Sequence, residues 1–153
     1  MRRTEEDKAK LAEEFFLQGY ACSQAILLAF AGDIGLDELT AKKIASTFGG
    51  GMGRLRKTCG ALTGSFMVIG MLYGNTKAGD LETKLKSYGL VQEMAKQFEE
   101  QHGTLCCGDL LAQHVSPEQV QGREHHRKIC HRLVQDAARI LADIVRDEEG
   151  RKK

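Results

Sequence analysis

Residues 59–73 read CGALTGSFMVIGMLY, and this apolar stretch decides the fold class. We expect a helix here that is nearly all buried, with Thr58 as its N-cap. Glycine inside a helix costs about 1 kcal/mol relative to alanine. Gly60, Gly64 and Gly70 therefore indicate that another helix approaches this one closely.

The segments on either side of this stretch also predict helices. A first helix from Glu5 to Phe30 carries Gly19, which interrupts and kinks it. A second, capped by Asp37, continues to about Phe48. Further helices are expected over residues 81–101, from about Cys107, and over 123–146, with Ser116 and Pro117 as an N-cap and first helical position. The predicted inward-facing residues outside 59–73 are Leu11, Phe15, Cys22, Ile26, Phe30, Leu39, Ile44, Ala45, Leu81, Leu85, Tyr88, Val91, Met94, Ala95, Phe98, Leu110, Leu111, Cys130, Leu133, Ala137, Leu141 and Ile144.

Composition supports an all-α fold. The chain has 153 residues, 42% of them hydrophobic, and a single proline. This length suits one domain over residues 1–153, with charged, frayed ends. Strand signals are absent, so we expect a small helical bundle of about five to six helices.

Charge and hydropathy exclude several classes of function. A formal net charge of +1 gives no field that draws in nucleic acid or an acidic membrane. No apolar run approaches the length of about 18 residues that spans a bilayer. The charged stretch from Met1 to Lys10 is unlike a signal peptide. We therefore expect a cytoplasmic protein that binds neither nucleic acid nor membrane.

The five cysteines are the most informative residues. Their odd number, wide spacing and lack of a CxxC motif argue against a secreted disulfide framework. Cys59 falls in the first turn of its predicted helix, where free N–H groups and the helix dipole favour an anion. Arg54, Arg56 and Lys57 add positive potential, so we expect a lowered thiol pKa at Cys59. The alternative is a buried cysteine that only fills the core.

Other cysteines are placed to join Cys59. Cys22 and Cys130 lie on the inward faces of their helices, so their sulfurs point toward the interior where Cys59 begins its helix. Cys106 and Cys107 are adjacent, and adjacent helical residues do not share a face. At most one of this pair is expected in a cysteine cluster.

The glycine-rich loop and the histidines offer weaker candidates. Gly51, Gly53 and Arg54 belong to the run GGGMGR, which precedes a helix and can cradle a phosphate. No strand precedes it and no GK[ST] follows. We favour glycines that let the backbone pass close to the cysteine helix, with Arg54 able to hold an anionic substrate beside Cys59. The histidines of interest, with their i,i+4 cysteine partners where these exist, are His102 with Cys106, His126 with Cys130, His125 and His131; His126 is a candidate fourth metal ligand.

Four separated segments together resemble one known family. They are ACSQAIL, FGGGMGRLRKTCGALTGSFMVIGMLYG, LCCGDLLA and ICHRLVQDAARIL, and the likeness extends from about Phe15 to Ile144. The chain is similar to the C_GCAxxG_C_C family of redox-active proteins. The resemblance implies that the family's four cysteines fall on Cys22, Cys59, Cys107 and Cys130, with Cys106 as an extra. No CxxCH haem-attachment site is present, so we expect no covalent haem.

Three functions stay open. The first is thiol–disulfide or electron-transfer chemistry, with Cys59 attacking and Cys22, Cys107 or Cys130 as its partner. The second is binding of zinc or an iron–sulfur cluster by the same four cysteines. The third is a helical interaction domain whose cysteines are structural. The expected partner is a redox protein or a small thiol or electron carrier, and the glycine-bearing helix can also serve a homodimer.

Overall fold

A computed structural model describes residues 4–113 and 123–151, with the backbone alone for 123–125. Over these residues it contains no strand, so the all-α prediction is confirmed; its one β-bridge joins Thr58 to Cys106. There are seven regular helices in this part of the chain, slightly more than predicted, and one irregular turn, α4. The segments are α1 (Glu5–Leu17), α2 (Cys22–Ile34), α3 (Glu38–Ser46), α4 (Gly49–Met52), α5 (Gly60–Tyr73), α6 (Leu81–His102), α7 (Cys107–Ala112) and α8 (Arg123–Arg151).

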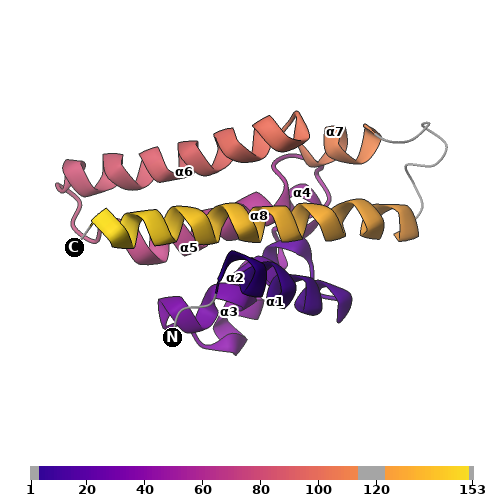
Figure 1. Cartoon of the computed structure of the whole chain (residues 1–153), viewed down its shortest axis with the longest axis horizontal. Coiled ribbons are helices and arrows are strands. Elements are labelled where there is room, and N and C mark those ends of the chain that lie inside the picture. Colours follow the sequence, from indigo (N-terminus) through magenta and orange to yellow (C-terminus); the bar gives the residue numbers. More distant parts are fainter. Residues whose placement is uncertain (1–3, 114–122, 152–153) are drawn as a thin grey trace.

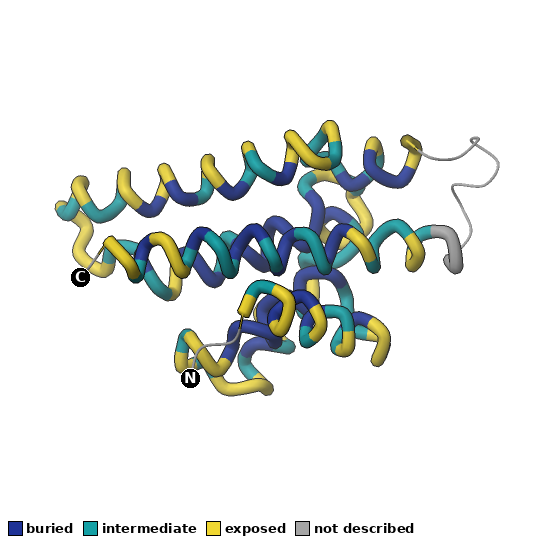
Figure 2. Tube along the Cα trace, viewed as in Figure 1, coloured by how far each residue is buried: buried dark blue, intermediate teal, exposed yellow. Residues whose placement is uncertain are grey.

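The long helix α8 organises the arrangement. It runs across the middle of the molecule, antiparallel to α6, while α1, α2 and α3 lie on its other side (Figure 1). The most extensive packing is between α1 and α8 and between α2 and α5. Buried residues gather along α2 and α5 and on the inner faces of α6 and α8 (Figure 2). The short segments α4 and α7 meet at one end of α5, where the cysteines lie.

The first predicted helix is two helices. Leu17 ends α1, and α2 begins at Cys22. Gly19 has a φ of 108°, a left-handed value that glycine adopts easily, and Ala21 is extended. The backbone therefore breaks at Gly19 instead of bending. Because of this break, Cys22 is the first residue of α2. The single kinked helix that the sequence predicted would have placed Cys22 in its interior.

The close approach predicted for the apolar helix is confirmed at two of its three glycines. A Cβ on Gly64 would lie 2.7 Å from the carbonyl oxygen of Ser23, and one on Gly60 would lie 3.1 Å from the Ser23 nitrogen. Gly70 has no such neighbour. The first half of α5 packs tightly on α2, whereas Met71 near its end is exposed. The prediction of near-complete burial is therefore wrong for the last turns of this helix.

Several predicted inward faces are wrong. On α3, Ala45 is buried as predicted, but Leu39 and Ile44 are exposed and Ala41 is buried in their place. On α6, Met94 and Phe98 are buried as predicted, but the buried stripe continues through Leu90 and Ser87 and so is offset from the predicted one toward the start of the helix. That offset leaves Leu81, Leu85 and Tyr88 exposed.

The helix ends match the predictions at most positions. The carboxylate of Asp37 accepts a hydrogen bond from the backbone N–H of Thr40 at 3.0 Å, as expected of an N-cap. Residue 59, not Thr58, is the N-cap of α5. The last helix continues to Arg151 instead of ending near Arg146, and Ser116 and Pro117 lie outside the described residues. In the described part of the chain, no helix is both long and apolar enough to cross a bilayer.

Candidate functional site

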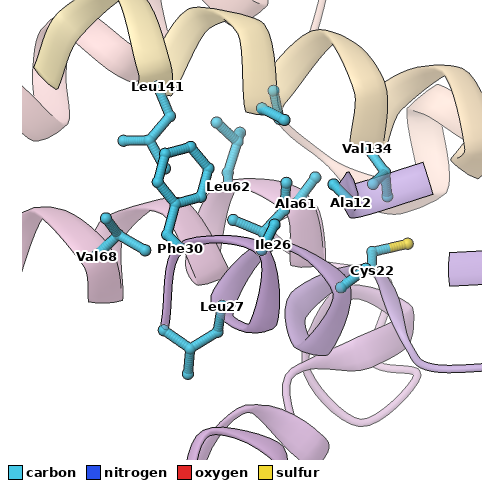
Figure 3. Close-up of a cluster of buried hydrophobic side chains, with 14 of the residues drawn as sticks. Ala12, Cys22, Ile26, Leu27, Phe30, Ala61, Leu62, Val68, Val134 and Leu141 are labelled. Atoms are coloured by element: carbon cyan, nitrogen blue, oxygen red, sulfur yellow. The ribbon is translucent and has the colours of Figure 1, made fainter. Parts of the chain in front are cut away.

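Cys22 is held in place by the start of α2. The side chain of Gln24 accepts a hydrogen bond from the N–H of Ala21 at 3.0 Å and so caps the helix. The hydroxyl of Ser23 donates to the carbonyl of Ala45 on α3 at 2.7 Å. Figure 3 shows Cys22 at the edge of the apolar cluster, with its sulfur directed away from Ile26 and Leu27. The Cys22 thiol therefore faces out of the apolar core but is itself buried.

A backbone ladder places Cys59 beside Cys107. The N–H of Cys59 donates to the carbonyl of Leu105 at 2.9 Å, and the N–H of Cys107 donates to the carbonyl of Lys57. These bonds flank the Thr58–Cys106 bridge. The ladder itself consists of main-chain groups, so it joins the starts of α5 and α7 independently of side-chain identity.

The structure separates the two adjacent cysteines. The Cys106 thiol donates to the carbonyl oxygen of Arg56 at 3.1 Å, while the Cys107 sulfur accepts from Nη1 of Arg56 at 3.7 Å. Cys107 is buried and Cys106 is half-buried. As expected, only one of the pair reaches the other cysteines, and it is the one that the family resemblance implies.

Cys130 on α8 meets Cys22 on α2. The Cys22 and Cys130 side chains line the same small cavity, and the hydrogen-bonding interaction between their thiols shifts the pKa of both. This interaction stabilises the Cys130 anion and lowers its pKa, although burial acts the other way and the charge of Arg56 adds a further lowering effect. The same contact and burial raise the pKa of Cys22 well above its ordinary value. Two sulfurs from different helices thus lie within reach of each other.

Four of the five cysteines line one small cavity, namely Cys22, Cys59, Cys107 and Cys130. Its volume is about 30 Å³, comparable to the space of a single water molecule. Arg56 also lines it, as the only cation among its described lining residues. The remaining wall consists of glycine backbone and three leucines, namely Gly50, Gly51, Gly60, Leu110, Leu111 and Leu133. All five cysteines of the chain are free thiols.

The lowered pKa predicted for Cys59 is wrong. Burial raises the pKa of this thiol to about 12. The amides of Ala61 and Leu62 at the start of α5 act in the predicted direction, but no side-chain hydrogen bond caps the helix. Since Cys59 is only 3% exposed, the cost of removing water from the anion outweighs the helix start. Burial likewise raises the pKa of Cys107, with Arg56 opposing it.

The cation at the cysteines is Arg56, not Arg54. Arg54 is exposed and is not among the residues that line the cavity, whereas Arg56 contacts Cys107 directly. Both arginines, together with Met52, have left-handed backbone angles, with φ values of 65° for Arg54 and 59° for Arg56. Left-handed backbone runs from Gly50 to Arg54 and recurs at Arg56, and it turns the loop so that residue 56 points inward. The spacing of residues in the sequence does not reveal this inward orientation of Arg56.

The glycines of the loop bring backbone close to the cysteines, as predicted. A Cβ on Gly51 would lie 2.5 Å from the Cβ of Cys107, and one on Gly60 would lie 3.2 Å from that of Cys22. Gly53 is exposed and lies outside the cavity. Of the two glycines considered for cofactor binding, Gly51 therefore belongs to the cysteine site and Gly53 does not.

The histidines lie elsewhere. His131 bonds Glu13 at 2.9 Å and so ties α8 to α1, and His102 lies 3.1 Å from the carboxylate of Asp136. His126 is half-buried, and the side chain of His125 lies outside the described residues. Thiolates suit zinc and iron, but in the described ranges no three His, Cys, Asp or Glu side chains are arranged to hold a metal ion.

Together, the fold and the site define an all-helical protein in which four helices contribute cysteines to one buried cavity. The chain belongs to the family described as "Putative redox-active protein (C_GCAxxG_C_C)", whose model matches residues 20–144. No curated protein and no solved structure matches the chain. The redox activity is thus supported at the level of the family.

Proposed function

We propose that this protein carries out thiol–disulfide exchange, with Cys130 and Cys22 as the pair that is oxidised and reduced. The observation that carries the proposal is that the Cys22 and Cys130 side chains line the same small cavity, where their thiols interact. A disulfide needs two sulfurs whose backbones can come within bonding range, and exchange needs one sulfur that ionises readily. The Cys22–Cys130 contact supports both requirements.

The two sulfurs differ in a way that suggests their roles. Cys130 is half-buried and has a lowered pKa, whereas Cys22 is buried and has a raised pKa. The thiolate is the nucleophile, so Cys130 is suited to attack an external disulfide. Cys22 is suited to resolve the mixed disulfide that follows. This assignment replaces Cys59 as the attacking thiol.

The other cysteines have supporting roles in this proposal. Cys59 and Cys107 are buried and have raised pKa values, so they react slowly with external reagents. Cys106 bonds a backbone carbonyl and lies outside the cavity. A cytoplasmic location, expected from composition, supplies the reducing conditions under which all five thiols start free.

The test is mild oxidation of the reduced protein followed by peptide mapping without reductant. We expect one intramolecular disulfide, between Cys22 and Cys130, with loss of two hydrogen atoms from the chain. Cys130→Ser should abolish this disulfide, while the matched control Cys106→Ser should leave it unchanged. A different pairing, or oxidation that only links separate chains, overturns the assignment.

The same preparation tests the metal-binding alternative. Protein purified without oxygen is analysed for iron and zinc and for visible absorbance before oxidation. Under the proposal we expect neither metal in stoichiometric amount and five titratable thiols. Stoichiometric iron or zinc that is lost in each of Cys22→Ser, Cys59→Ser, Cys107→Ser and Cys130→Ser would assign the four cysteines as ligands instead.

A further inference from the structure

A second cavity lies beside the cysteine site, on the same part of α8. It measures about 510 Å³, within the range of pockets that hold small molecules. Residues of α6 and α8 line it, together with Gln113, which directly follows α7. Leu133 lines both this cavity and the cysteine cavity. Leu133 therefore forms part of the boundary between a space large enough for a substrate and the cavity that Cys130 lines.

The small cavity cannot hold a disulfide substrate by itself. Its volume of about 30 Å³ is roughly that of one water molecule. The body of any substrate whose sulfur reaches Cys130 must therefore lie outside it. The larger cavity shares Leu133 with the small one. We therefore expect the larger cavity to hold the rest of the substrate.

The charges around the larger cavity are unbalanced. Lys128 and Arg132 lie one helical turn apart on its α8 wall, and neither has a hydrogen-bond or ion-pair partner among the described residues. The carboxylate of Asp136 is the one acidic group among the described lining residues. It is already paired, with Arg139 at 2.9 Å and His102 at 3.1 Å. The unpaired charge facing the cavity is therefore positive.

The polar uncharged groups suit the same kind of ligand. Gln101, near the end of α6, and Gln113, which follows α7, line the cavity with amides that can donate to a carboxylate. Ile129 and Leu133 supply an apolar side. A carboxylate-bearing molecule with a short apolar middle matches this combination of donors, cations and apolar wall.

We propose that the cavity between α6 and α8 binds the substrate of the exchange reaction, a small disulfide that carries carboxylate groups. This inference rests on the proposed function of Cys130 and Cys22. Lys128 and Arg132 hold the carboxylates, and the disulfide bond extends past Leu133 toward Cys130. Both cations act by positioning the substrate and take no part in the bond changes.

The exchange reaction consists of two successive attacks by a thiolate on a disulfide bond. The Cys130 thiolate attacks one substrate sulfur, a mixed disulfide forms, and the first thiolate leaves and takes a proton from water. Cys22 then attacks the Cys130 sulfur, the mixed disulfide breaks, and the Cys22 proton passes to the second leaving thiolate. The substrate gains two electrons and becomes two thiols, while the two cysteines lose two electrons and become a disulfide.

The test compares three disulfides that differ in charge: glutathione disulfide (anionic), hydroxyethyl disulfide (neutral) and cystamine (cationic). Formation of the intramolecular disulfide in the full-length protein is followed by mass spectrometry after acid quenching. The double variant Lys128→Gln/Arg132→Gln should react about 5- to 10-fold more slowly with glutathione disulfide at low salt, as expected for two exposed ion pairs. With hydroxyethyl disulfide the change should be less than about twofold.

Two controls isolate the effect of charge at this place. The double variant Lys10→Gln/Lys43→Gln removes the same net charge from exposed positions on α1 and α3, and it should leave the glutathione disulfide rate unchanged. Lys128→Glu/Arg132→Glu should react faster with cystamine than the wild type does. At about 1 M NaCl, where the Debye length is about 3 Å, the differences should shrink.

The outcomes separate this inference from the proposed function. If all three reagents form the Cys22–Cys130 disulfide but the variants change their rates equally, the exchange activity stands and the anion site is overturned. If none of them forms this disulfide, the proposed function itself fails. A selective loss with glutathione disulfide alone supports both.

Discussion

The thiol of Cys22, at the first residue of α2, lines the same small cavity as the sulfur of Cys130 on α8, and the two groups interact there. The contact makes two chemically identical side chains unequal, because it favours an anion on one sulfur and opposes it on the other. It also connects two helices whose cysteines are far apart in the sequence. The chemistry of the site depends on this pairing more than on any single residue.

Removing the donor should make Cys130 less acidic. In Cys22→Ala the Cys130 anion loses its hydrogen bond, so its pKa rises and its alkylation by iodoacetamide shifts to higher pH. The measurement is the rate of Cys130 labelling against pH, read by peptide mass spectrometry. Cys106→Ala serves as the control and should leave the profile in place. An unchanged profile in Cys22→Ala would show that the hydrogen bond does not govern this sulfur.

The buried thiol of Cys59 should make the fold sensitive to alkaline pH. Its pKa is raised from 9.0 to about 12, so its stabilising effect is complete below pH 9 and is lost as the pH rises toward 12. The loss is about 1.4 kcal/mol per pH unit in that window. Urea unfolding at about pH 8 and pH 10.5 should show that Cys59→Ala loses about 2 kcal/mol less than the wild type between the two conditions. Equal losses would contradict the burial of this thiol.

Arg56 should control the reactivity of Cys107. Its guanidinium lies 3.7 Å from the Cys107 sulfur and lowers a pKa that burial raises. Arg56→Gln should therefore slow alkylation of Cys107 a few-fold at about pH 8. Arg54→Gln is a matched control, because it removes the same charge from the same loop at an exposed position. If the two variants behave alike, the effect comes from net charge and not from the contact.

The close approach of α5 to α2 should make Gly64 intolerant of any side chain. A Cβ at this position would lie 2.7 Å from a backbone oxygen, which cannot move independently of its helix. We expect Gly64→Ala to destabilise the fold by about 1–3 kcal/mol. Gly70→Ala, on the same helix with nothing within 4 Å of the added Cβ, should instead stabilise it by about 0.5–1 kcal/mol. Urea unfolding of both variants tests the difference, and similar effects at the two sites would argue against the packing.

The sequence alone was sufficient for most of the fold, because composition and helical periodicity are local properties. The sequence-based prediction was wrong where packing against another helix decides which side chains are buried. Leu81, Leu85 and Tyr88 repeat at helical spacing, yet α8 and α5 cover the adjacent stripe of α6. The helix break at Gly19 depends on a backbone angle for which a single glycine gives only a weak signal.

The candidate site was predictable in its members but not in its chemistry. The cysteine residues were evident from the motif, and the inward faces of α2 and α8 indicated that Cys22 and Cys130 converge. Which sulfur ionises depends on burial and on contacts between distant segments, so a rule based on helix position was wrong for Cys59. The inward arginine depends on left-handed backbone at Arg54 and Arg56, which residue type does not reveal.

The backbone ladder between residues 57–59 and 105–107 has a consequence for how this chain can vary. Between Cys59 and Leu105 the chain forms the hairpin of α5 and α6. Main-chain hydrogen bonds join the two ends of this hairpin. Residues added or removed at its far end, between Tyr73 and Leu81, change the length of a hairpin but not the separation of its two ends. The relative positions of the Cys59 and Cys107 sulfurs therefore do not depend on the length of the loop between α5 and α6.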